Sequence, residues 1–587
     1  MGGIVTGVMA PEVYWLCVPV IFMNSNQINN FRRPTSSAKE KFYSDLVKIA
    51  TRLLVQQDRD PYSRTFGCFD RHYWSWKLTD FSEATYQRNV YTLAYCLSEF
   101  EGLVGLSKVN LIDSIKASFV YTNVIQHKDG SFDQAFPFER SFGATAFLLD
   151  SLLDSFEIVE QFLEDDFAGK VVDSLRKAAE FLSSHNETHG LISNHLAGAS
   201  LSLMKAGMKF EEPLWVDRAN FFYKHVLENQ SSEGWYLEYD GADPGYQTLC
   251  IYYLAQLYKL TNDAKLRDSL ENAVDFTSCF AHPDGSFAGE YGSRRTAIFY
   301  PGGLALLGKD MPVASSLISK MLDSYLQGKS VEPHAIDMGN LAPLAANYIL
   351  MAKSGVFDSY DIGLSLPCDK DTFVCDFLGA GLSIRGNKKY YAVIGISNGG
   401  VVKIFDKMKR KKIFDDCGYV GQLENGTFLT TQIRQKYNLD KCTSESLVFD
   451  ASFYEMIRTL PTPAKFIILR ILNVTLMRNV WFGNFIKSFL VKMLVSKRKK
   501  APVMIMRSFS FLDDRVEIID QIICQKKIDF KWLEAGRRFV AIHMASSRYF
   551  SDSDAESYVG GRAVLSVDVR KLSKDFVVEV SRNIQCW

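Results

Sequence analysis

The chain has 587 residues, of which 47% are hydrophobic and 23% charged, and its 67 basic residues balance its 67 acidic ones. A chain of this length can bury more than one core, so we expect two or more domains. The zero net charge gives no sign of nucleic-acid binding. The eleven cysteines stand singly, which argues against a disulfide framework or a structural zinc site.

Residues 1–38 form an N-terminal apolar segment. It differs from a secretion signal because it lacks a positively charged start and carries Pro11, Glu12 and Pro19 within the apolar stretch. The stretch is also too interrupted to span a membrane. We therefore expect a cytoplasmic protein.

Residues 39–358 alternate helix-period segments with loops of one kind. The loops 126–138, 186–196, 231–246 and 282–303 each place a turn-forming glycine before a strand-like or aromatic pair, and a helical segment follows. This repeat predicts helical hairpins. Hairpins with similar loops on one side indicate an α/α toroid, although an open solenoid has the same pattern. The predicted helical segments are 39–56, 83–100, 109–126, 141–160, 166–184, 194–206, 213–228, 246–261, 263–280, 296–308, 312–327 and 338–353.

Residues 359–587 change to a period of two. Short β-branched and aromatic runs are separated by Gly-Asn and Asn-Gly-Gly turns, for example in 382–407. The pattern predicts an antiparallel β-sandwich or supersandwich domain after the toroid.

A basic, apolar insertion interrupts this second domain at residues 456–512. It contains eleven Lys or Arg residues and no Asp or Glu, so the rest of the neutral chain carries eleven excess negative charges. Such a segment suits peripheral contact with an anionic membrane through residues 464–500, at the inner membrane surface for a cytoplasmic protein. The alternative is a long buried helix with a solvated basic end.

Three side chains in two loops carry the chemistry. Asn194 and His195 open one apolar helical run, and Tyr246 opens another 52 residues after Asn194. An amide can hydrogen-bond a carboxylate and so acidify the neighbouring C–H, while imidazole and phenol are common proton carriers. This set suits proton abstraction beside the carboxylate of an acidic sugar.

These motifs resemble the heparinase II/III-like and alginate-lyase-like polysaccharide lyases, which join an α/α toroid to a β-sandwich. The resemblance implies that Asn194 neutralises the uronate carboxylate, that His195 assists or takes the C5 proton, and that Tyr246 acts as base or as acid to the leaving O4. The family also draws a catalytic His or Tyr from its β domain, where His543 is the only histidine. Gln247 departs from the His that many relatives carry after the tyrosine.

Each of the three residues also has a purely structural interpretation. Asn194 could cap its helix, His195 could be a satisfied pocket histidine, and Tyr246 could pack in the core with its hydroxyl bonded to a loop carbonyl.

Further residues are candidates for substrate binding. Adjacent arginines can hold carboxylates or sulfates through paired hydrogen bonds, and aromatic rings can stack on sugars. The alternatives are an ion pair between Glu290 and an arginine, and core packing of the tryptophans. The predicted substrate contacts are Arg71, His72, Trp74, Trp76, Tyr239, Glu290, Tyr291, Arg294 and Arg295.

Other functions stay open at this stage. Return of the proton to the opposite face would make the protein a uronate C5-epimerase in polysaccharide biosynthesis. Loop carboxylates such as Glu238 also allow a glycoside hydrolase, and a carbohydrate-binding or membrane-associated assembly protein is the non-enzyme alternative. No acidic motif of a terpene cyclase occurs, and no Walker loop, dinucleotide fingerprint or metal motif, so we expect neither cofactor nor metal. We expect a lyase with an acidic polysaccharide or oligosaccharide as its partner.

Overall fold

The computed structural model describes residues 38–187, 192–239, 241–357, 364–456, 462–479, 481–486, 499–536 and 565–586. The predicted N-terminal segment lies outside these ranges except for its last residue. The predicted domain boundary at 358/359 and His543 also lie outside them.

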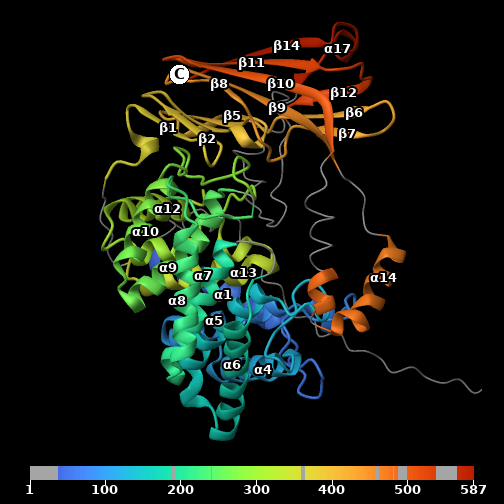
Figure 1. Ribbon diagram of the computed structural model, residues 1–587. Coiled ribbons are helices and arrows are strands. Elements are labelled where there is room, and N and C mark those ends of the chain that lie inside the picture. The colour runs from blue at the N-terminus through green and yellow to red at the C-terminus, as the bar shows by residue number, and fades with distance from the viewer. Residues whose placement is uncertain are drawn as a thin grey trace, which may run out of the picture. The chain divides into compact units, whose positions relative to one another are not determined.

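Helices make up the first part of the described chain (Figure 1). Every predicted helical segment contains a helix. The main difference is in 296–308, where α11 begins only at Gly302, because Pro301 precedes it and disfavours helical backbone at the residue before. The α-helices are α1 Ala38–Gln56, α2 Arg71–Trp74, α3 Val90–Ser98, α4 Lys108–Ile125, α5 Phe142–Val159, α6 Asp165–Ser184, α7 Ser193–Phe210, α8 Pro213–Glu228, α9 Pro244–Thr261, α10 Ala264–Ser278, α11 Gly302–Leu307, α12 Pro312–Leu326 and α13 Met338–Lys353.

The first helix closes the ring by contacting the last ones. The hydroxyl of Tyr325 in α12 donates to Oδ2 of Asp45 in α1 at 2.7 Å. Arg52 of α1 donates to the carbonyl of Ile336 at 2.8 Å, just before α13. The helical part is therefore an α/α toroid and not an open solenoid.

Two antiparallel sheets form the second part (Figure 1). The smaller has the order β1-β2-β3-β4-β5, and the larger has the order β13-β12-β6-β7-β9-β10-β11-β14, with β8 paired to β9. The strands are β1 Phe373–Phe377, β2 Leu382–Gly386, β3 Tyr390–Gly395, β4 Val401–Asp406, β5 Lys411–Asp416, β6 Tyr419–Leu423, β7 Phe428–Thr430, β8 Leu439–Cys442, β9 Ser446–Glu455, β10 Lys500–Phe511, β11 Arg515–Cys524, β12 Phe530–Ala535, β13 Leu565–Ser566 and β14 Val577–Gln585.

The smaller sheet lies between the toroid and the larger sheet. Successive side chains of a strand point to opposite faces. Tyr391 and Val393 of β3 accordingly join the core of the toroid, whereas Tyr390, Ala392 and Ile394 pack with the larger sheet. This arrangement explains why β2, β3 and β4 are buried along their whole length, and it confirms the predicted β-sandwich.

A buried ion network fixes the two sheets to each other. Arg507 of β10 donates from Nε to Oδ1 of Asp520 at 2.6 Å, and its Nη2 lies 3.1 Å from Oδ2 of Asp416. All three side chains have no exposed surface, and Arg582 contacts both carboxylates. The network therefore holds its charges away from water.

We expect Arg507→Met to lower the free energy of unfolding by about 3–5 kcal/mol, because it leaves two carboxylates buried with one cation fewer. The matched change Arg515→Met removes an arginine whose side chain is 35% exposed, and we expect it to cost about 0–1 kcal/mol. Denaturant midpoints of the full chain compare the two. Equal midpoints would contradict a stabilising role for the buried pair.

The predicted insertion is the connection from β9 to β10 together with β10 itself. Helix α14, Pro463–Val474, and a short 3₁₀ turn, Leu476–Arg478, occupy its described middle part. Residues from Lys500 onward pair in the larger sheet. The end of the basic segment is thus a regular strand, because its alternating apolar residues face the core.

Candidate active site

Two loops meet where α7 and α9 begin. Backbone bridges join Ile192 to Glu238 and Glu238 to Gly241, so the chain before α7 lies beside the chain before α9. Asn194 is 2% exposed and donates from Nδ2 to Oε2 of Glu238 at 2.6 Å. Helix α7 starts at Ser193 with Ile192 as its N-cap. Asn194 therefore lies within the first turn and does not cap the helix.

Arg294 connects Glu238 to two tyrosines. Its Nη1 donates to Oε1 of Glu238 at 2.8 Å. Its guanidinium carbon lies 3.5 Å from the ring centre of Tyr246 and 4.7 Å from that of Tyr239, an arrangement favoured by the negative faces of the rings. Asn194, Tyr239, Tyr246 and Arg294, predicted from separate loops, thus meet around one carboxylate.

Asp243 positions Tyr246 at the start of α9. Its carboxylate accepts hydrogen bonds from the backbone N of Tyr246 at 3.0 Å and of Arg294 at 2.8 Å. Burial raises the pKa of Asp243 to about 6, against the opposing effect of these donors. The carboxyl is therefore mostly ionised at neutral pH, and it ties the Arg294 loop to the helix that carries Tyr246.

Tyr246 is 8% exposed. Burial raises the pKa of its hydroxyl well above the usual value, although Arg294 acts in the opposite direction. At neutral pH the hydroxyl therefore keeps its proton and can donate it. Within the described ranges this hydroxyl makes no hydrogen bond, so the structural alternative of a bond to a loop carbonyl is not observed there.

His195 is oriented by Glu187. Its Nδ1 lies 2.7 Å from Oε2 of Glu187, whose side chain is 3% exposed. A carboxylate accepts, so the neutral imidazole carries its hydrogen on Nδ1 and has Nε2 as the acceptor. The ring also packs edge-on against Phe147, with ring centres 5.4 Å apart. His195 therefore combines a fixed orientation with a nitrogen that can take a proton.

Arg88 and Tyr253 also belong to this region, and sequence reasoning missed both. Arg88 donates from Nη2 to the hydroxyl of Tyr253 at 3.3 Å, and Phe147 stacks on Tyr253 at 5.4 Å. Tyr253 follows Tyr246 by seven residues on α9, a spacing that places both on one helix face and could have indicated it. Arg88 lies in a 3₁₀ stretch, Ala84–Asn89, and has no such signal.

The part of the chain that carries this cluster matches a known family domain. Residues 106–311 match the family model of the ulvan lyase N-terminal domain. The structure of Paenibacillus xanthan lyase aligns with a TM-score of 0.52 at 10% identity, over 86% of this chain and 47% of that one. The fold is that of polysaccharide lyases.

A second lyase has the same fold. The Streptomyces coelicolor A3 chondroitin AC lyase, solved in complex with chondroitin sulphate, aligns with a TM-score of 0.51 at 11% identity, over 84% of this chain and 68% of that one. The chain spans about half the length of the xanthan lyase. No curated protein sequence matches it. The family match over residues 106–311 and both folds confirm the predicted resemblance to the toroid fold of polysaccharide lyases.

The β domain of this lyase fold borders the site through the loop after β7. A Cβ on Gly241 would lie 2.1 Å from Cζ of Arg434, so a larger residue at this position would push the guanidinium aside. Arg434 donates to the Ser397 hydroxyl at 3.0 Å, and Arg295 donates to the carbonyl of Gln432. Arg295, a predicted substrate contact, therefore holds the toroid loop against the β domain.

Glu290 and Tyr291 lie in the same interface. Oε2 of Glu290 is 2.5 Å from Nζ of Lys403 in β4, so Glu290 forms an ion pair with a lysine of the β domain. The hydroxyl of Tyr291 lies 2.9 Å from Nε2 of His282. Both residues are buried, at 2% and 1% exposed. The Glu290–Lys403 ion pair and a hydrogen bond from Nδ2 of Asn398 to the carbonyl of Tyr291 at 2.9 Å join the two domains.

In the described ranges, no hydrogen bond or ion pair connects the aromatic segment near residue 70 to the cluster around Glu238. Trp74 is half-buried and donates from Nε1 to the carbonyl of Gln56 at 2.9 Å. Trp76 is 63% exposed. Arg71 and His72 form the short helix α2 with Trp74. The substrate role of these four residues stays a prediction.

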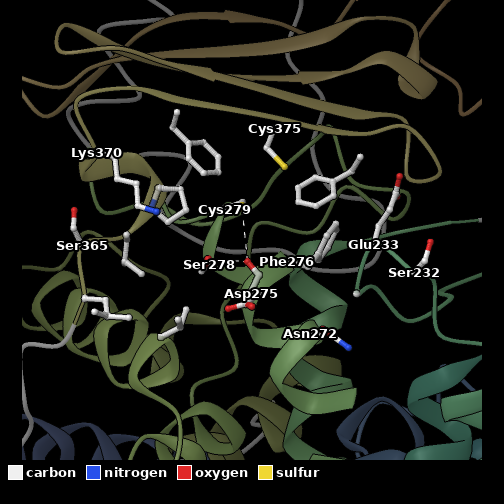
Figure 2. Close-up of a pocket in the computed structure, with 17 residues that line it drawn as sticks. Ser232, Glu233, Asn272, Asp275, Phe276, Ser278, Cys279, Ser365, Lys370 and Cys375 are labelled. Atoms are coloured by element: carbon white, nitrogen blue, oxygen red, sulfur yellow. Dashed lines mark hydrogen bonds between the residues drawn. The ribbon is translucent and has the colours of Figure 1, made fainter. Parts of the chain in front are cut away.

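A pocket of about 710 Å³ separates α10 from β1 (Figure 2). Glu233, Asp275, Cys279, Lys370 and Cys375 are among its lining residues, and the thiol of Cys279 donates to the carbonyl of Asp275 at 3.7 Å. Its lining includes neither Asn194 nor Tyr246. The cavity is therefore distinct from the candidate active site.

Proposed function

We propose that the protein is a polysaccharide lyase that removes the C5 proton of a uronate residue and eliminates the sugar bonded at C4. The observation that carries this proposal is that Asn194 and Arg294 both bind Glu238 while Arg294 also lies over the ring of Tyr246, within the residues that match the lyase domain. His195, adjacent to Asn194, adds an oriented imidazole.

Asn194 and Arg294 supply the donors that the chemistry needs. A C–H next to a carboxylate is a weak acid, because its loss places further negative charge on the carboxylate. One N–H of the Asn194 amide is bonded to Glu238, and its second N–H can bind the uronate carboxylate. The nearby guanidinium of Arg294 adds positive charge. Both effects stabilise the carbanion-like transition state.

The proton transfers divide between His195 and Tyr246. Nε2 of His195 takes the C5 proton, and the C–H electron pair forms the C4–C5 double bond as the C4–O4 bond breaks. The Tyr246 hydroxyl gives its proton to O4, in keeping with its raised pKa. Glu187 balances the imidazolium and Arg294 the phenolate until water restores both groups.

Hydrolysis is less well supported by the same geometry. A glycoside hydrolase needs one protonated carboxyl group as general acid. Glu238 accepts from Asn194 and Arg294, and Glu290 pairs with Lys403. Both carboxylates are thus already engaged by protein donors or cations.

Proton NMR in deuterated water tests the proposal, with ulvan, xanthan, chondroitin sulfate, heparan sulfate and alginate as substrates. We expect loss of the H5 signal together with an unsaturated uronate signal on at least one polymer. H5 exchange without the unsaturated signal would identify an epimerase instead. New reducing ends with intact H5 would identify a hydrolase.

His195→Gln separates the proposed base from a structural histidine. We expect a rate at least about 10²-fold lower, because proton transfer by a positioned side chain contributes about that much. His225→Gln is the matched control, since His225 lies on α8 with its side chain 46% exposed. An unchanged rate in His195→Gln would remove His195 from the proposal.

A further inference from the structure

Helix α14 presents its apolar residues to solvent. The side chain of Thr462 caps its first turn, and the helix begins at Pro463. Soluble proteins seldom expose large apolar side chains in one contiguous group. The exposed fractions are 48% for Phe466, 60% for Ile467, 59% for Ile468, 55% for Ile471 and 51% for Val474.

The helical residues 481–486 after α14 also expose apolar side chains. Trp481 is 68% exposed and Phe485 62% exposed, and their rings stack with centres 6.1 Å apart. Phe482 packs edge-on against Trp481 at 4.9 Å. We call the exposed apolar side chains of residues 462–479 and 481–486 the apolar face.

Polar contacts with the toroid hold the opposite side of this segment. Arg470 lies 2.8 Å from Oδ2 of Asp80, and Arg140 donates to the carbonyl of Arg478 at 3.0 Å. Asn473 and Met477 are fully buried on this side. Figure 1 shows α14 set away from the strands that flank it in sequence. The segment is therefore mounted on the toroid with its apolar face outward, and it is not the buried helix of the alternative interpretation.

Charge indicates what covers the apolar face. The described residues 462–479 and 481–486 contain Lys465, Arg470 and Arg478 and no acidic residue. Arg470 pairs with Asp80 on the toroid side, whereas Lys465 and Arg478 are exposed. Exposed basic residues next to an apolar helix face favour an anionic lipid surface, and tryptophan is enriched at the membrane–water interface. No helix among the described residues is long and apolar enough to cross a bilayer. A helix that lies in the plane of the surface fits these features.

We propose that the apolar face of residues 462–479 and 481–486 docks on the surface of an anionic phospholipid bilayer. The side chains of Phe466, Ile467, Ile471 and Trp481 enter the boundary between headgroups and acyl chains, and Lys465 contacts lipid phosphate. The toroid contacts of Arg470 and Arg140 then fix the orientation of the protein on the membrane. This proposal is independent of the reaction at Tyr246.

Co-sedimentation of the full chain with vesicles tests the proposal. The vesicles are phosphatidylcholine alone or phosphatidylcholine with about one third phosphatidylglycerol, at low and high salt. We expect binding to the anionic vesicles that weakens with salt. Ile467→Asp/Ile471→Asp should lower the partition coefficient at least about tenfold, because it places two charges in the apolar face that enters the lipid.

Val104→Asp/Leu214→Asp is the matched control, because it makes the same change at side chains 89% and 76% exposed outside the apolar face. It should bind as the wild type does. All three proteins should show the same circular dichroism spectrum, since the changed side chains are on the surface. Trp481→Glu provides an independent variant with the same expected loss.

Three results would overturn the proposal. One is that the wild type does not bind anionic vesicles at low salt. Another is that binding survives both Ile467→Asp/Ile471→Asp and Trp481→Glu, or falls equally in the control. The third is a wild-type dimer in size-exclusion chromatography that the variants dissociate, without vesicle binding, which would assign the apolar face to a second copy of the chain.

Discussion

Tyr246→Phe should lower the rate of elimination by about 10³-fold, near the middle of the range for a lost general acid. The change removes only the hydroxyl that delivers a proton to O4. The ring remains, so the contact 3.5 Å from the Arg294 guanidinium carbon and the packing of α9 should persist. The measurement is the ultraviolet absorbance of the unsaturated uronate, together with the H5 signal in deuterated water.

Tyr258→Phe is the control for this experiment, because Tyr258 lies near the other end of the same helix. It should keep the wild-type rate. If Tyr246→Phe lost elimination but kept H5 exchange, Tyr246 would act only on the leaving group, as proposed. If elimination stayed within a few-fold of the wild type, another residue would supply the proton and the assigned role of Tyr246 would be wrong.

Helical periodicity predicted most of the toroid because each helix buries one face against its neighbours. Helices α8 and α13 have the predicted bounds. Ring closure depends instead on contacts between distant segments, such as Tyr325 with Asp45, 280 residues apart. Local sequence carries no signal for such a pair.

The candidate site, like the toroid, was predicted from the sequence only in part. The two motifs placed Asn194 and Tyr246 in loops of the same character, and the structure joins them through Glu238 and Arg294. The sequence predicts both Arg294 and Glu290 as substrate contacts. Because Glu290 pairs with Lys403 of β4, the two residues separate into the site and the domain interface. A contact between the two domains places Glu290 at the interface, and the spacing of residues within the loop cannot predict such a contact.

The departure at Gln247 also has a structural explanation. Its side chain accepts from the backbone N of Tyr236 at 2.9 Å and donates to the carbonyl of Gly234 at 3.2 Å. Gln247 therefore braces the turn before α9, and the imidazole proposed as base comes from α7. The proposed reaction therefore does not need a histidine at position 247.

Asn194→Asp should reduce kcat/KM by about 10³-fold. Loss of one preorganised donor to a developing oxyanion costs about 10²–10³. The new carboxylate would also lie next to Glu238, whose Oε2 is 2.6 Å from the present amide, and would repel the uronate carboxylate. The substrate and the transition state both carry that negative charge, so we expect a higher KM as well as a lower kcat.

Asn110→Asp introduces the same charge at an exposed position of α4 and should leave both constants unchanged. Two adjacent buried carboxylates also destabilise the fold. Thermal melting of both variants therefore distinguishes activity lost through unfolding from activity lost because the amide is missing. If Asn194→Asp is folded at the assay temperature and inactive, the amide acts on the substrate. If it is folded and retains the wild-type kcat/KM, Asn194 only positions Glu238, and the uronate carboxylate must be neutralised by Arg294 alone.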